Sequence, residues 1–296
     1  MKVTANSIQM EVEDSAPGAN HLPVVLLIMG LGMQLVAWPA ELVQALVDAG
    51  YRVVRHDNRD IGLSQHFDQV GVPNMVRAML RFKFGLAINP PYSLHDMAAD
   101  SVGVLDALRI EKAHMVGVSM GGMIAQRVAL AAPDRVASLT SIMSSSGARG
   151  LPSARPKVLQ AMFRRPASSQ RADIVAHYVR LYKAIGSPGF PISEPDLVKL
   201  ILQGVQRNFH PVGTMRQLVA IVADSTRAAA LARIDRPTLV LHGRADPLIP
   251  FPCGEDTARR ISGAQLVGVD GMGHDLPPGV VERLLTPLLP FLQTHS

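Results

Sequence analysis

The stretch GVSMGG, residues 117–122, joins a strand-like run at residues 113–118 to a helix-like run at residues 120–131. In that setting its core, G-x-S-x-G, is typical of a nucleophile elbow, a tight strand-to-helix turn that exposes the hydroxyl of Ser119. The two outer glycines of the core let backbone segments approach without a Cβ clash. The first N–H groups of the helix point toward the same place. On its own the motif fits an ordinary glycine-rich connection equally well, so the rest of the sequence must decide.

Strand-like and helix-like runs alternate along most of the chain. Residues 24–29 (VVLLIM) form a continuous apolar run of the kind found in strands buried on both faces. We expect strands at residues 4–13 (an edge strand or hairpin), 24–29, 51–55, 113–118, 136–143, 238–241 and 265–269. We expect helices at residues 38–49, 75–84, after the capping box Ser93-x-x-Asp96, at 120–131, and at 280–292, the last interrupted by Pro287 and Pro290. This alternation predicts an α/β fold in which a mostly parallel central sheet carries helices on both faces.

The character of the sequence changes after the strand expected at residues 136–143. The segment SSSGARGLPSARP, which begins at Ser144, is small, polar and rich in proline, and marks a boundary. Only helical patterns follow until about residue 226, including the apolar face formed by Ile174, Tyr178, Leu181, Tyr182 and Ile185 and runs at residues 197–205 and 212–222. We therefore predict a helical cap (lid) domain inserted into a core domain, with the cap at residues 144–225 and the core at residues 1–143 and 226–296.

The composition is that of an ordinary globular protein. Hydrophobic residues make up 48% of the 296 residues and charged residues 18%, which supplies a core and argues against disorder. The formal net charge is +5, but no basic run is interleaved with aromatic residues, so we expect no nucleic-acid partner. Cys253 is the only cysteine, which excludes an intrachain disulfide.

The sequence shows no targeting or membrane signal. The first 14 residues lack the apolar core and cleavage site of a signal peptide. The longest apolar run, residues 22–33, is too short to span a bilayer and ends in glycines. We therefore expect a cytoplasmic location and no stable membrane insertion. The oligomeric state is left open.

A serine hydroxyl is a weak nucleophile and needs a base, which in turn needs an acid to orient it. On this type of sheet the chain order is serine, then acid, then histidine. Asp246 follows the strand expected at residues 238–241, and His274 follows the one at residues 265–269. Both therefore belong at the same sheet edge as Ser119, where open parallel sheets bind ligands.

Other histidines and acids compete for these roles. His242 also lies at a strand end, but it precedes a turn glycine and suits a structural role better. Asp270 and Asp275 flank His274, and such close neighbours rarely reach around to the ring nitrogen of the histidine. The site one strand earlier, where some enzymes of this build carry the acid, reads Ser-Ser-Ser and offers no carboxylate. We therefore favour Asp246.

Acyl transfer also needs donors for an oxyanion. The backbone N–H of Met120, the residue after the nucleophile, is one expected donor, and the N–H of Leu31 in the loop MGLG is the other. An ordinary glycine turn is the alternative for that loop. Many of the 14 methionines are core residues, but we expect the Met120 side chain to form part of the pocket wall as well.

Two motifs could suggest other chemistry. The loop HDNRDIGLS, residues 56–64, contains His56, Asp57 and Asp60, which could suggest a metal site, and Arg59, which could suggest an anion site. A structural loop that ties down neighbouring backbone fits it better. No His/Cys/Asp cluster elsewhere has the spacing of a metal site, and MGLG lacks a phosphate-binding pattern. We expect neither metal nor cofactor.

Together these motifs resemble the α/β-hydrolase fold superfamily across nearly the whole chain. LIMGLGMQ, HDNRDIGLS, GVSMGG, HGRADPLIP and DGMGHDLP occur in the family's order and spacing. MGLG followed by AWP, the DNRDIGLS loop and PPYSLHDMAAD look like the carboxylesterase branch that includes aclacinomycin methylesterase. The resemblance implies the triad Ser119, Asp246 and His274, oxyanion donors at Leu31 and Met120, and a helical cap.

The expected activity is that of a serine hydrolase that cleaves a carboxylic ester through an acyl-enzyme. Dehalogenases and epoxide hydrolases of this fold carry aspartate at the elbow, so Ser119 argues against both. A lactonase, perhydrolase or C–C bond hydrolase would use the same triad, and a non-enzymatic ligand-binding protein is a further alternative. We expect a small-molecule ester of apolar character as substrate. Its acyl and alcohol sizes, and the cap residues that line the pocket, are not determined by the sequence.

Overall fold

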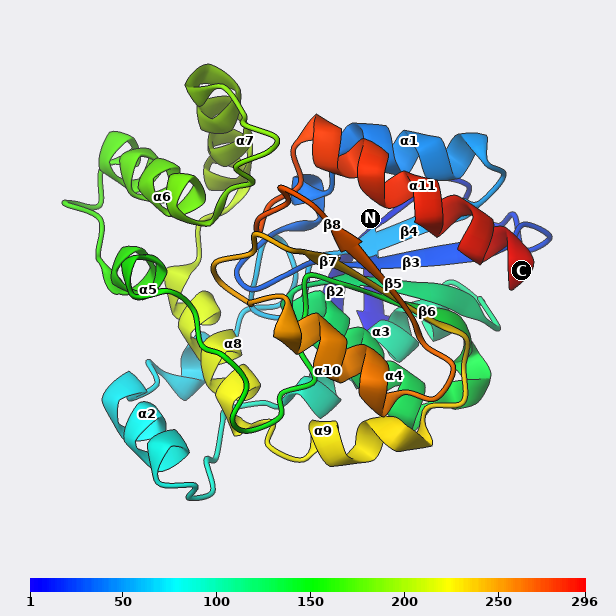
Figure 1. Ribbon diagram of the computed structural model, residues 1–296, viewed down its shortest axis with the longest axis horizontal. Coiled ribbons are helices and arrows are strands. Elements are labelled where there is room, and N and C mark those ends of the chain that lie inside the picture. The colour runs from blue at the N-terminus through cyan, green and yellow to red at the C-terminus, as the bar shows by residue number, and fades with distance from the viewer.

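The computed structural model describes residues 1–296, and its centre is one eight-stranded sheet (Figure 1). The strand order is β1-β2-β4-β3-β5-β6-β7-β8. The strands are β1 (Lys2–Ala5), β2 (Ile8–Asp14), β3 (Val24–Ile28), β4 (Arg52–His56), β5 (Ala113–Val118), β6 (Val136–Ile142), β7 (Thr238–Gly243) and β8 (Gln265–Val269). Strands β4, β3, β5, β6, β7 and β8 run parallel, whereas β1 and β2 form an antiparallel hairpin on one edge. The predicted α/β fold is confirmed.

The apolar runs of the sequence become the inner strands. Every residue of β3 (VVLLI), β5 and β7 is buried, as expected of parallel strands covered on both faces. The chain leaves β4 on one side of β3 and continues with β5 on its other side. This reversal of strand order places a crevice at the carboxyl ends of β3 and β5, the usual ligand position in open α/β sheets.

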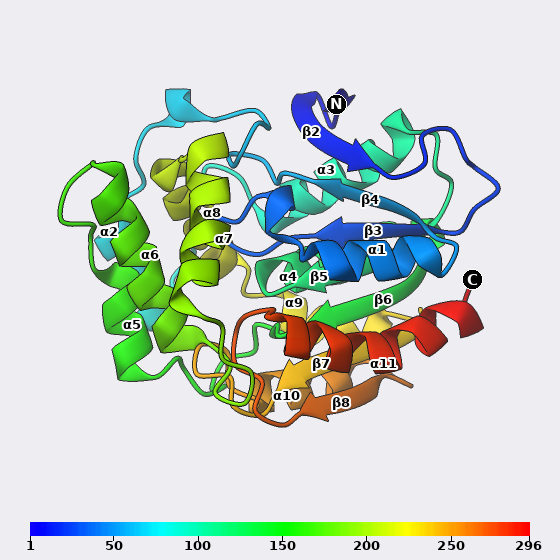
Figure 2. The ribbon, with the colours of Figure 1, turned by 90° about the horizontal axis from the view of Figure 1, so that it is seen from above.

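Helices cover both faces of the sheet (Figures 1 and 2). On one face, α1 (Ala40–Asp48) and α11 (Pro278–Thr294) pack beside one another, and on the other lie α3 (Leu94–Ala107), α4 (Met120–Ala131) and α10 (Pro252–Arg260). Two separate apolar clusters correspond to these faces, one of 29 and one of 22 buried residues. Short elements complete the core: α9 (Arg227–Ala230) and the 3-10 helices η1 (Leu35–Ala37), η2 (Asp68–Val70), η3 (Pro133–Arg135) and η4 (Leu231–Arg233).

The C-terminal helix corrects one prediction. We expected Pro287 and Pro290 to interrupt it, but α11 continues through both. The two prolines lie three residues apart on the partly or fully exposed side, whereas Leu284, Leu288 and Phe291 are buried. Water can therefore bind the carbonyl groups that the prolines leave unpaired, and the buried apolar face keeps the helix in place.

Between β6 and β7 the chain builds four helices over the carboxyl ends of the strands (Figure 1). They are α5 (Pro156–Phe163), α6 (Arg171–Ile185), α7 (Glu194–Arg207) and α8 (Pro211–Ala223). Helix α5 was not predicted, because it begins at the last proline of the boundary segment, where the sequence indicates a loop. Helix α2 (Met75–Lys83) packs on α8 and lies at the same end of the molecule as α5 and α6 in both ribbon views (Figures 1 and 2). None of the helices combines the length and apolar character that crossing a membrane requires.

Candidate active site

Ser119 lies at the turn between β5 and α4, as the sequence predicts. Its backbone has φ +55° and ψ −119°, a strained conformation for a residue with a Cβ. The glycines explain how the turn is tolerated: a Cβ on Gly117 would overlap the backbone of Gly121, and a Cβ on Gly121 would overlap the carbonyl group of Ile28. The N–H of Ser119 donates to Ile142 O at 2.9 Å, which fixes the turn to the neighbouring strand.

Ser119, His274 and Asp246 form one hydrogen-bonded chain. His274 Nε2 lies 3.0 Å from Ser119 Oγ, and His274 Nδ1 lies 2.7 Å from Asp246 Oδ2. The second carboxylate oxygen of Asp246 accepts the N–H groups of Leu248 and Ile249, each at 2.9 Å. Three hydrogen bonds therefore hold the carboxylate, two from backbone on Oδ1 and one from the imidazole ring on Oδ2. Ser119 and Asp246 are 127 positions apart in the chain, and Asp246 and His274 are 28 apart. The three meet because each follows a strand that ends at the same edge of the sheet.

The competing residues lie elsewhere. His242 Nε2 contacts Ile249 O at 2.8 Å and is 3.7 Å from Asp246, and burial lowers the pKa of this histidine. Asp270 is exposed and pairs with Arg244. Asp275 accepts a hydrogen bond from Ser187 Oγ at 2.5 Å, and burial raises its pKa. Neither acid forms a hydrogen bond with the His274 ring.

The loop that carries His274 is held by the end of α6. The N–H of His274 donates to Ile185 O at 2.7 Å, and the N–H of Gly273 donates to Ser187 Oγ at 2.8 Å. Sequence reasoning missed these contacts. The only available signal was the Gly/Pro-rich break that starts at Gly186, which indicates a turn but not its partner.

The loop MGLG lies directly beside the elbow. A Cβ on Gly30 would lie 3.2 Å from Ser119 Cβ. The loop is held from outside, because the N–H of Gly32 donates to Gln217 Oε1 at 2.9 Å and Asn58 Nδ2 donates to Met29 O at 2.9 Å. The oxyanion role of the Leu31 and Met120 N–H groups stays a prediction.

One expectation for the pocket wall is wrong. The Met120 side chain is fully buried in the larger apolar cluster and does not line the cavity. Met120 is the first residue of α4, and its side chain packs with the helices and strands of the core, which leaves only its backbone for a role beside Ser119.

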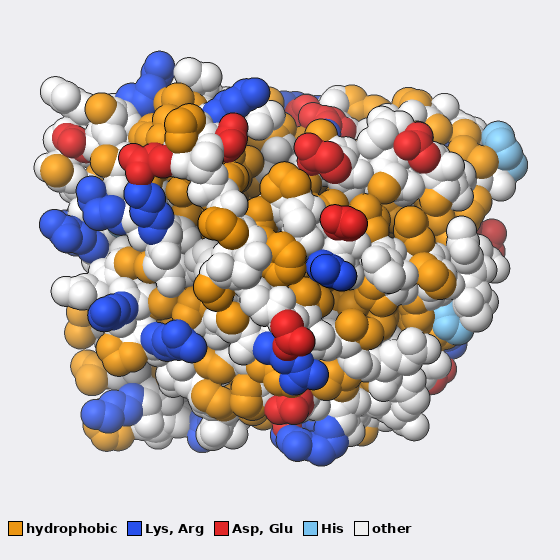
Figure 3. Space-filling view, turned by 45° about the horizontal axis from the view of Figure 1, so that its top comes forward, with side chains coloured by type: hydrophobic (Ala, Val, Ile, Leu, Met, Phe, Trp, Pro, Cys, Tyr) orange, Lys and Arg blue, Asp and Glu red, His pale blue; other side chains and the backbone are white.

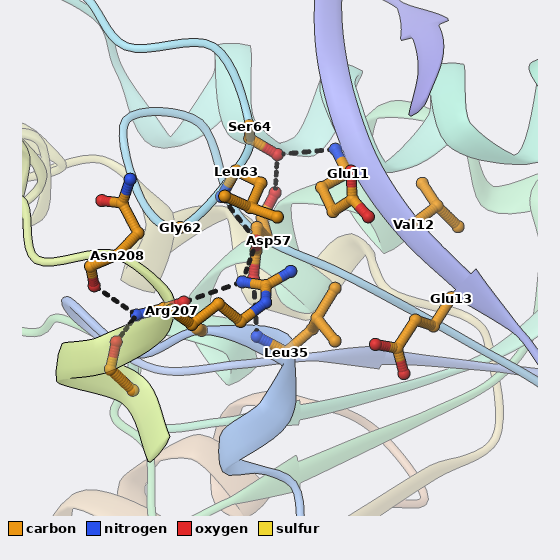
Figure 4. Close-up of polar contacts among 12 residues, drawn as sticks. Glu11, Val12, Glu13, Leu35, Asp57, Gly62, Leu63, Ser64, Arg207 and Asn208 are labelled. Carbon is orange, nitrogen blue, oxygen red and sulfur yellow. Dashed lines mark hydrogen bonds and ion pairs between the residues drawn. The ribbon is translucent and has the colours of Figure 1, made fainter. Parts of the chain in front are cut away.

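The HDNRDIGLS loop is structural, as the sequence indicates (Figure 4). The buried carboxylate of Asp57 accepts the N–H groups of Leu35 at 2.7 Å and Leu63 at 2.8 Å. Arg207, from the end of α7, donates to the same carboxylate at 2.6 Å. Ser64 Oγ donates to the Asp57 carbonyl oxygen at 2.6 Å. Asp57 therefore joins the loop after β3, its own loop and the helices above the sheet.

The α/β-hydrolase fold family matches residues 23–277, a span that includes Ser119, Asp246 and His274. The chain belongs to the α/β-hydrolase fold family. The resemblance seen in the motifs is thereby confirmed.

Relatives of this α/β hydrolase include two esterases. Rhodomycin D methylesterase of Streptomyces peucetius is 30% identical over 282 residues, which cover 88% of this chain and 87% of the relative. The bifunctional esterase/perhydrolase of Acinetobacter calcoaceticus is 27% identical over 292 residues, which cover 94% of both chains. The chain is an esterase-type α/β hydrolase.

Solved structures share the fold over the full chain. The enol-lactonase from Burkholderia xenovorans superposes with a TM-score of 0.72 at 20% identity, covering 99% of this chain and 100% of the other. The meta-cleavage product hydrolase from Pseudomonas fluorescens superposes with a TM-score of 0.76 at 19% identity, covering 100% and 98%. At these identities the likeness establishes architecture only.

A cavity of about 1260 Å³ lies between the sheet edge and the helices above it in this α/β hydrolase. Ser119 and His274 lie on its floor side, and residues of α6, α7 and α8 form its roof. Of its 47 lining residues 26 are hydrophobic, among them the methionines Met29, Met33, Met75, Met143, Met162 and Met215. The space accommodates a substrate with a large apolar part.

One group of side chains resembles a metal site in composition. The ligand atoms of His66, Asp68 and His210 lie within 4.8 Å of one another. Spacing alone did not indicate this group, because Asp68 and His210 are 142 residues apart. The two imidazole rings stack in parallel, 3.9 Å apart and at an angle of 2°. Their nitrogen lone pairs therefore lie in separate planes and do not converge on one ion. Both ring nitrogens of His210 already face oxygens, Asp60 O at 2.8 Å and Asp68 Oδ1 at 2.9 Å.

Proposed function

We propose that this protein hydrolyses a carboxylic ester with Ser119 as nucleophile, His274 as general base and acid, and Asp246 as the acid that orients the histidine. The observation that supports it is the unbroken chain from Ser119 Oγ through His274 to Asp246, with separations of 3.0 and 2.7 Å. Asp246 accepts from Nδ1–H, which leaves the Nε2 lone pair facing the serine hydroxyl. That tautomer is the one required to take the hydroxyl proton.

The first half of the reaction forms an acyl-enzyme. Ser119 Oγ attacks the ester carbonyl carbon while its proton passes to His274 Nε2. The tetrahedral intermediate collapses, the bond to the alcohol oxygen breaks, and His274 returns the proton to that oxygen. In the second half His274 takes a proton from water, the hydroxide attacks the acyl carbon, and Ser119 leaves with the proton.

The developing oxyanion is proposed to accept the backbone N–H groups of Leu31 and Met120. Both flank Ser119, one in the loop after β3 and the other at the first turn of α4. The positive end of the α4 dipole favours a negative charge at the same place. Removing one such donor from an enzyme typically slows catalysis by about 100- to 1000-fold.

The proposed substrate is a small-molecule ester with an apolar part. The mainly hydrophobic lining of the cavity supports this, and no step above calls for a metal or cofactor. The helices over the cavity, within the cap proposed at residues 144–225, would then select the ester. The proposed cytoplasmic location stays a prediction.

The test uses purified protein and p-nitrophenyl esters of increasing acyl length, with Ser119→Ala and, as matched control, Ser145→Ala. Ser145 is buried nearby but does not contact His274. We expect Ser119→Ala to lose at least about 10,000-fold in kcat and the control to retain activity. We expect kcat/KM to rise with acyl length by up to about fourfold per methylene, because each buries further apolar surface. Full activity of Ser119→Ala would contradict the proposal.

A panel of lactones, peracid formation from acetate and peroxide, and a C–C cleavage substrate separates the other reactions that the same triad supports. Faster turnover of any of these than of every ester would reassign the reaction while leaving the three residue roles in place.

A further inference from the structure

Helix α2 directs an apolar stripe outward. Val76, Leu80 and Phe84 follow one another at intervals of four residues and so lie on one side of the helix. They are 71%, 51% and 68% exposed. On the other side Ala78 is buried, and Phe82, one turn further on, is 51% exposed. A surface helix of a globular protein normally places such a stripe against the core. Here half or more of the surface of each of these side chains is exposed to solvent.

The stripe continues into neighbouring segments. Val72 and Leu86, which flank the helix, are 65% and 54% exposed. Phe163, at the end of α5, is 56% exposed, and α2 and α5 lie at one end of the molecule in both ribbon views (Figures 1 and 2). Single exposed apolar residues are common, but several large ones gathered on one helix and its flanks indicate an interaction site.

Basic side chains border this apolar group. Arg77, Arg81 and Lys83 lie on α2 itself, Arg149 lies beside the turn at Gly85, and two arginines follow Phe163. None of these six forms an ion pair with a carboxylate. Figure 3 shows Lys and Arg concentrated on the left half of the molecule, with apolar side chains between them.

The net charge is also distributed unevenly along the chain. Residues 144–225 contain eleven basic and four acidic side chains, a formal net charge of +7. The other residues contain 18 basic and 20 acidic side chains, a net charge of −2. The helices between β6 and β7, which lie at the same end of the molecule as α2, are therefore strongly cationic, whereas the rest of the chain is not.

We define the α2–α5 surface as Val72, Val76, Arg77, Leu80, Arg81, Lys83, Phe84, Leu86, Arg149, Phe163, Arg164 and Arg165. We propose that the α2–α5 surface docks this protein onto an anionic lipid bilayer. A short amphipathic helix with apolar side chains outward and Lys or Arg beside them is the physical requirement for interfacial binding. The apolar side chains enter the acyl boundary and the cations meet the anionic headgroups.

The α2–α5 surface adjoins the opening of the cavity that contains Ser119. Val72, Phe163, Arg164 and Arg165 belong both to the α2–α5 surface and to the lining of the cavity that contains Ser119. The docked face is therefore continuous with the interior of the cavity. An apolar molecule dissolved in the bilayer would reach the cavity without crossing water.

The test is flotation of the protein with vesicles in a sucrose gradient, in the absence of any ester. One set of vesicles is phosphatidylcholine with 30% phosphatidylglycerol, and the other is phosphatidylcholine alone. The apolar variant is Val76→Gln/Leu80→Gln/Phe84→Gln, and the charge variant is Lys83→Glu. Lys112→Glu is the matched control, because Lys112 is also exposed but lies at the amino end of β5, whereas the cavity lies at the carboxyl ends of the strands. Thermal unfolding followed by circular dichroism checks that the variants fold.

We expect wild-type protein and Lys112→Glu to float equally with the anionic vesicles. The apolar variant should lose more than about tenfold in partition. Lys83→Glu should lose about fivefold or more, and so should wild-type protein on neutral vesicles. The proposal is overturned if wild-type protein does not float with anionic vesicles, or if the folded apolar variant floats as well as wild type. Binding instead to an acidic acyl carrier protein, with the same lysine dependence, would also overturn it and make the surface a protein-docking site.

Discussion

The strands that carry Ser119, Asp246 and His274 and the helices that roof the cavity are held together by different means. At the sheet edge backbone touches backbone: a Cβ on Gly121 would overlap the carbonyl of Ile28, and a Cβ on Gly243 would overlap that of Met272. The helices above have a small apolar cluster of their own, with four buried residues, Val175, Val179, Leu197 and Ile201. They are joined to the sheet domain by polar contacts such as those of Arg207 and Arg216.

The two kinds of packing suit two different requirements of an enzyme, the positioning of reacting atoms and the selection of a substrate. Atoms that react must be held to fractions of an ångström, and close backbone contact does that. Residues that select a substrate need only shape and polarity, and side chains on lightly packed helices supply them. Substitutions at the sheet edge should therefore abolish the reaction, whereas equivalent substitutions above it should have smaller effects.

The largest expected effect comes from the acid of the triad. Asp246→Asn keeps the shape of the side chain but favours the wrong tautomer of His274, so kcat should fall by about 10,000-fold. Asp270→Asn is the control, because Asp270 also follows a strand near His274 but is exposed. Steady-state kinetics on one ester should show no change for the control. Equal losses of kcat in Asp246→Asn and Asp270→Asn would contradict the assignment of Asp246 as the acid of the triad.

Two glycines test the packing side of the comparison directly. Gly121→Ala should cost at least about 3 kcal/mol of unfolding free energy or prevent folding, since its Cβ meets backbone that cannot move aside. Gly204→Ala in α7 should stabilise the protein by about 0.5 kcal/mol, because only Gln34 Nε2, at 3.7 Å, lies near the added methyl group. Urea unfolding followed by circular dichroism measures both. A Gly121→Ala variant with unchanged unfolding free energy would contradict the claim that close backbone contact holds the sheet edge.

The polar contact between the two regions should have an intermediate effect. Arg207→Met leaves the buried carboxylate of Asp57 without its cation and should cost about 3 kcal/mol. Lys183→Met removes an ion pair with Glu194 in which both side chains are more than half exposed, and should cost less than about 1 kcal/mol. The same urea titrations decide between these outcomes, and a larger loss for Lys183→Met would contradict the expectation.

The last prediction concerns pH and the sheet domain, and its effect is smaller than those of Gly121→Ala and Arg207→Met. Burial, together with the charges of His295 and Lys112, lowers the pKa of His114 to about 4. Unfolded histidine binds a proton near pH 6.5, so the unfolded state gains protons that the folded state does not, and stability is lost as pH falls from 6.5 toward 4. Between pH 7 and pH 5 this one residue should cost about 2 kcal/mol. His114→Gln should lower the loss by that amount. An unchanged pH dependence in the variant would exclude His114 as its source.

The sequence predicted the elbow best. The run at residues 113–118 and the helix at residues 120–131 have the bounds that the structure gives, because both the apolar pattern and the turn glycines are local signals. The order of strands placed the side chains of Asp246 and His274 at the same edge as Ser119 without any knowledge of distances.

The parts that depend on distant neighbours could not be predicted. The carbonyl of Ile185 that holds His274, and the contact between Arg207 and Asp57, join segments whose relative placement no local pattern encodes. The continuous helix through Pro287 depends on which face is buried. The outward stripe of α2 is likewise invisible in the sequence, where the same spacing predicts a buried face.

Covalent labelling tests the central claim most directly. An activated serine oxygen attacks the phosphorus of a fluorophosphonate, fluoride leaves, and the serine keeps a phosphonate whose added mass identifies the modified peptide. We predict one adduct per chain, on the peptide that contains Ser119, no adduct in folded Ser119→Ala, and much slower labelling in Asp246→Asn. An unlabelled folded wild-type protein, or an adduct on any other residue, would contradict the assignment of Ser119 as the nucleophile.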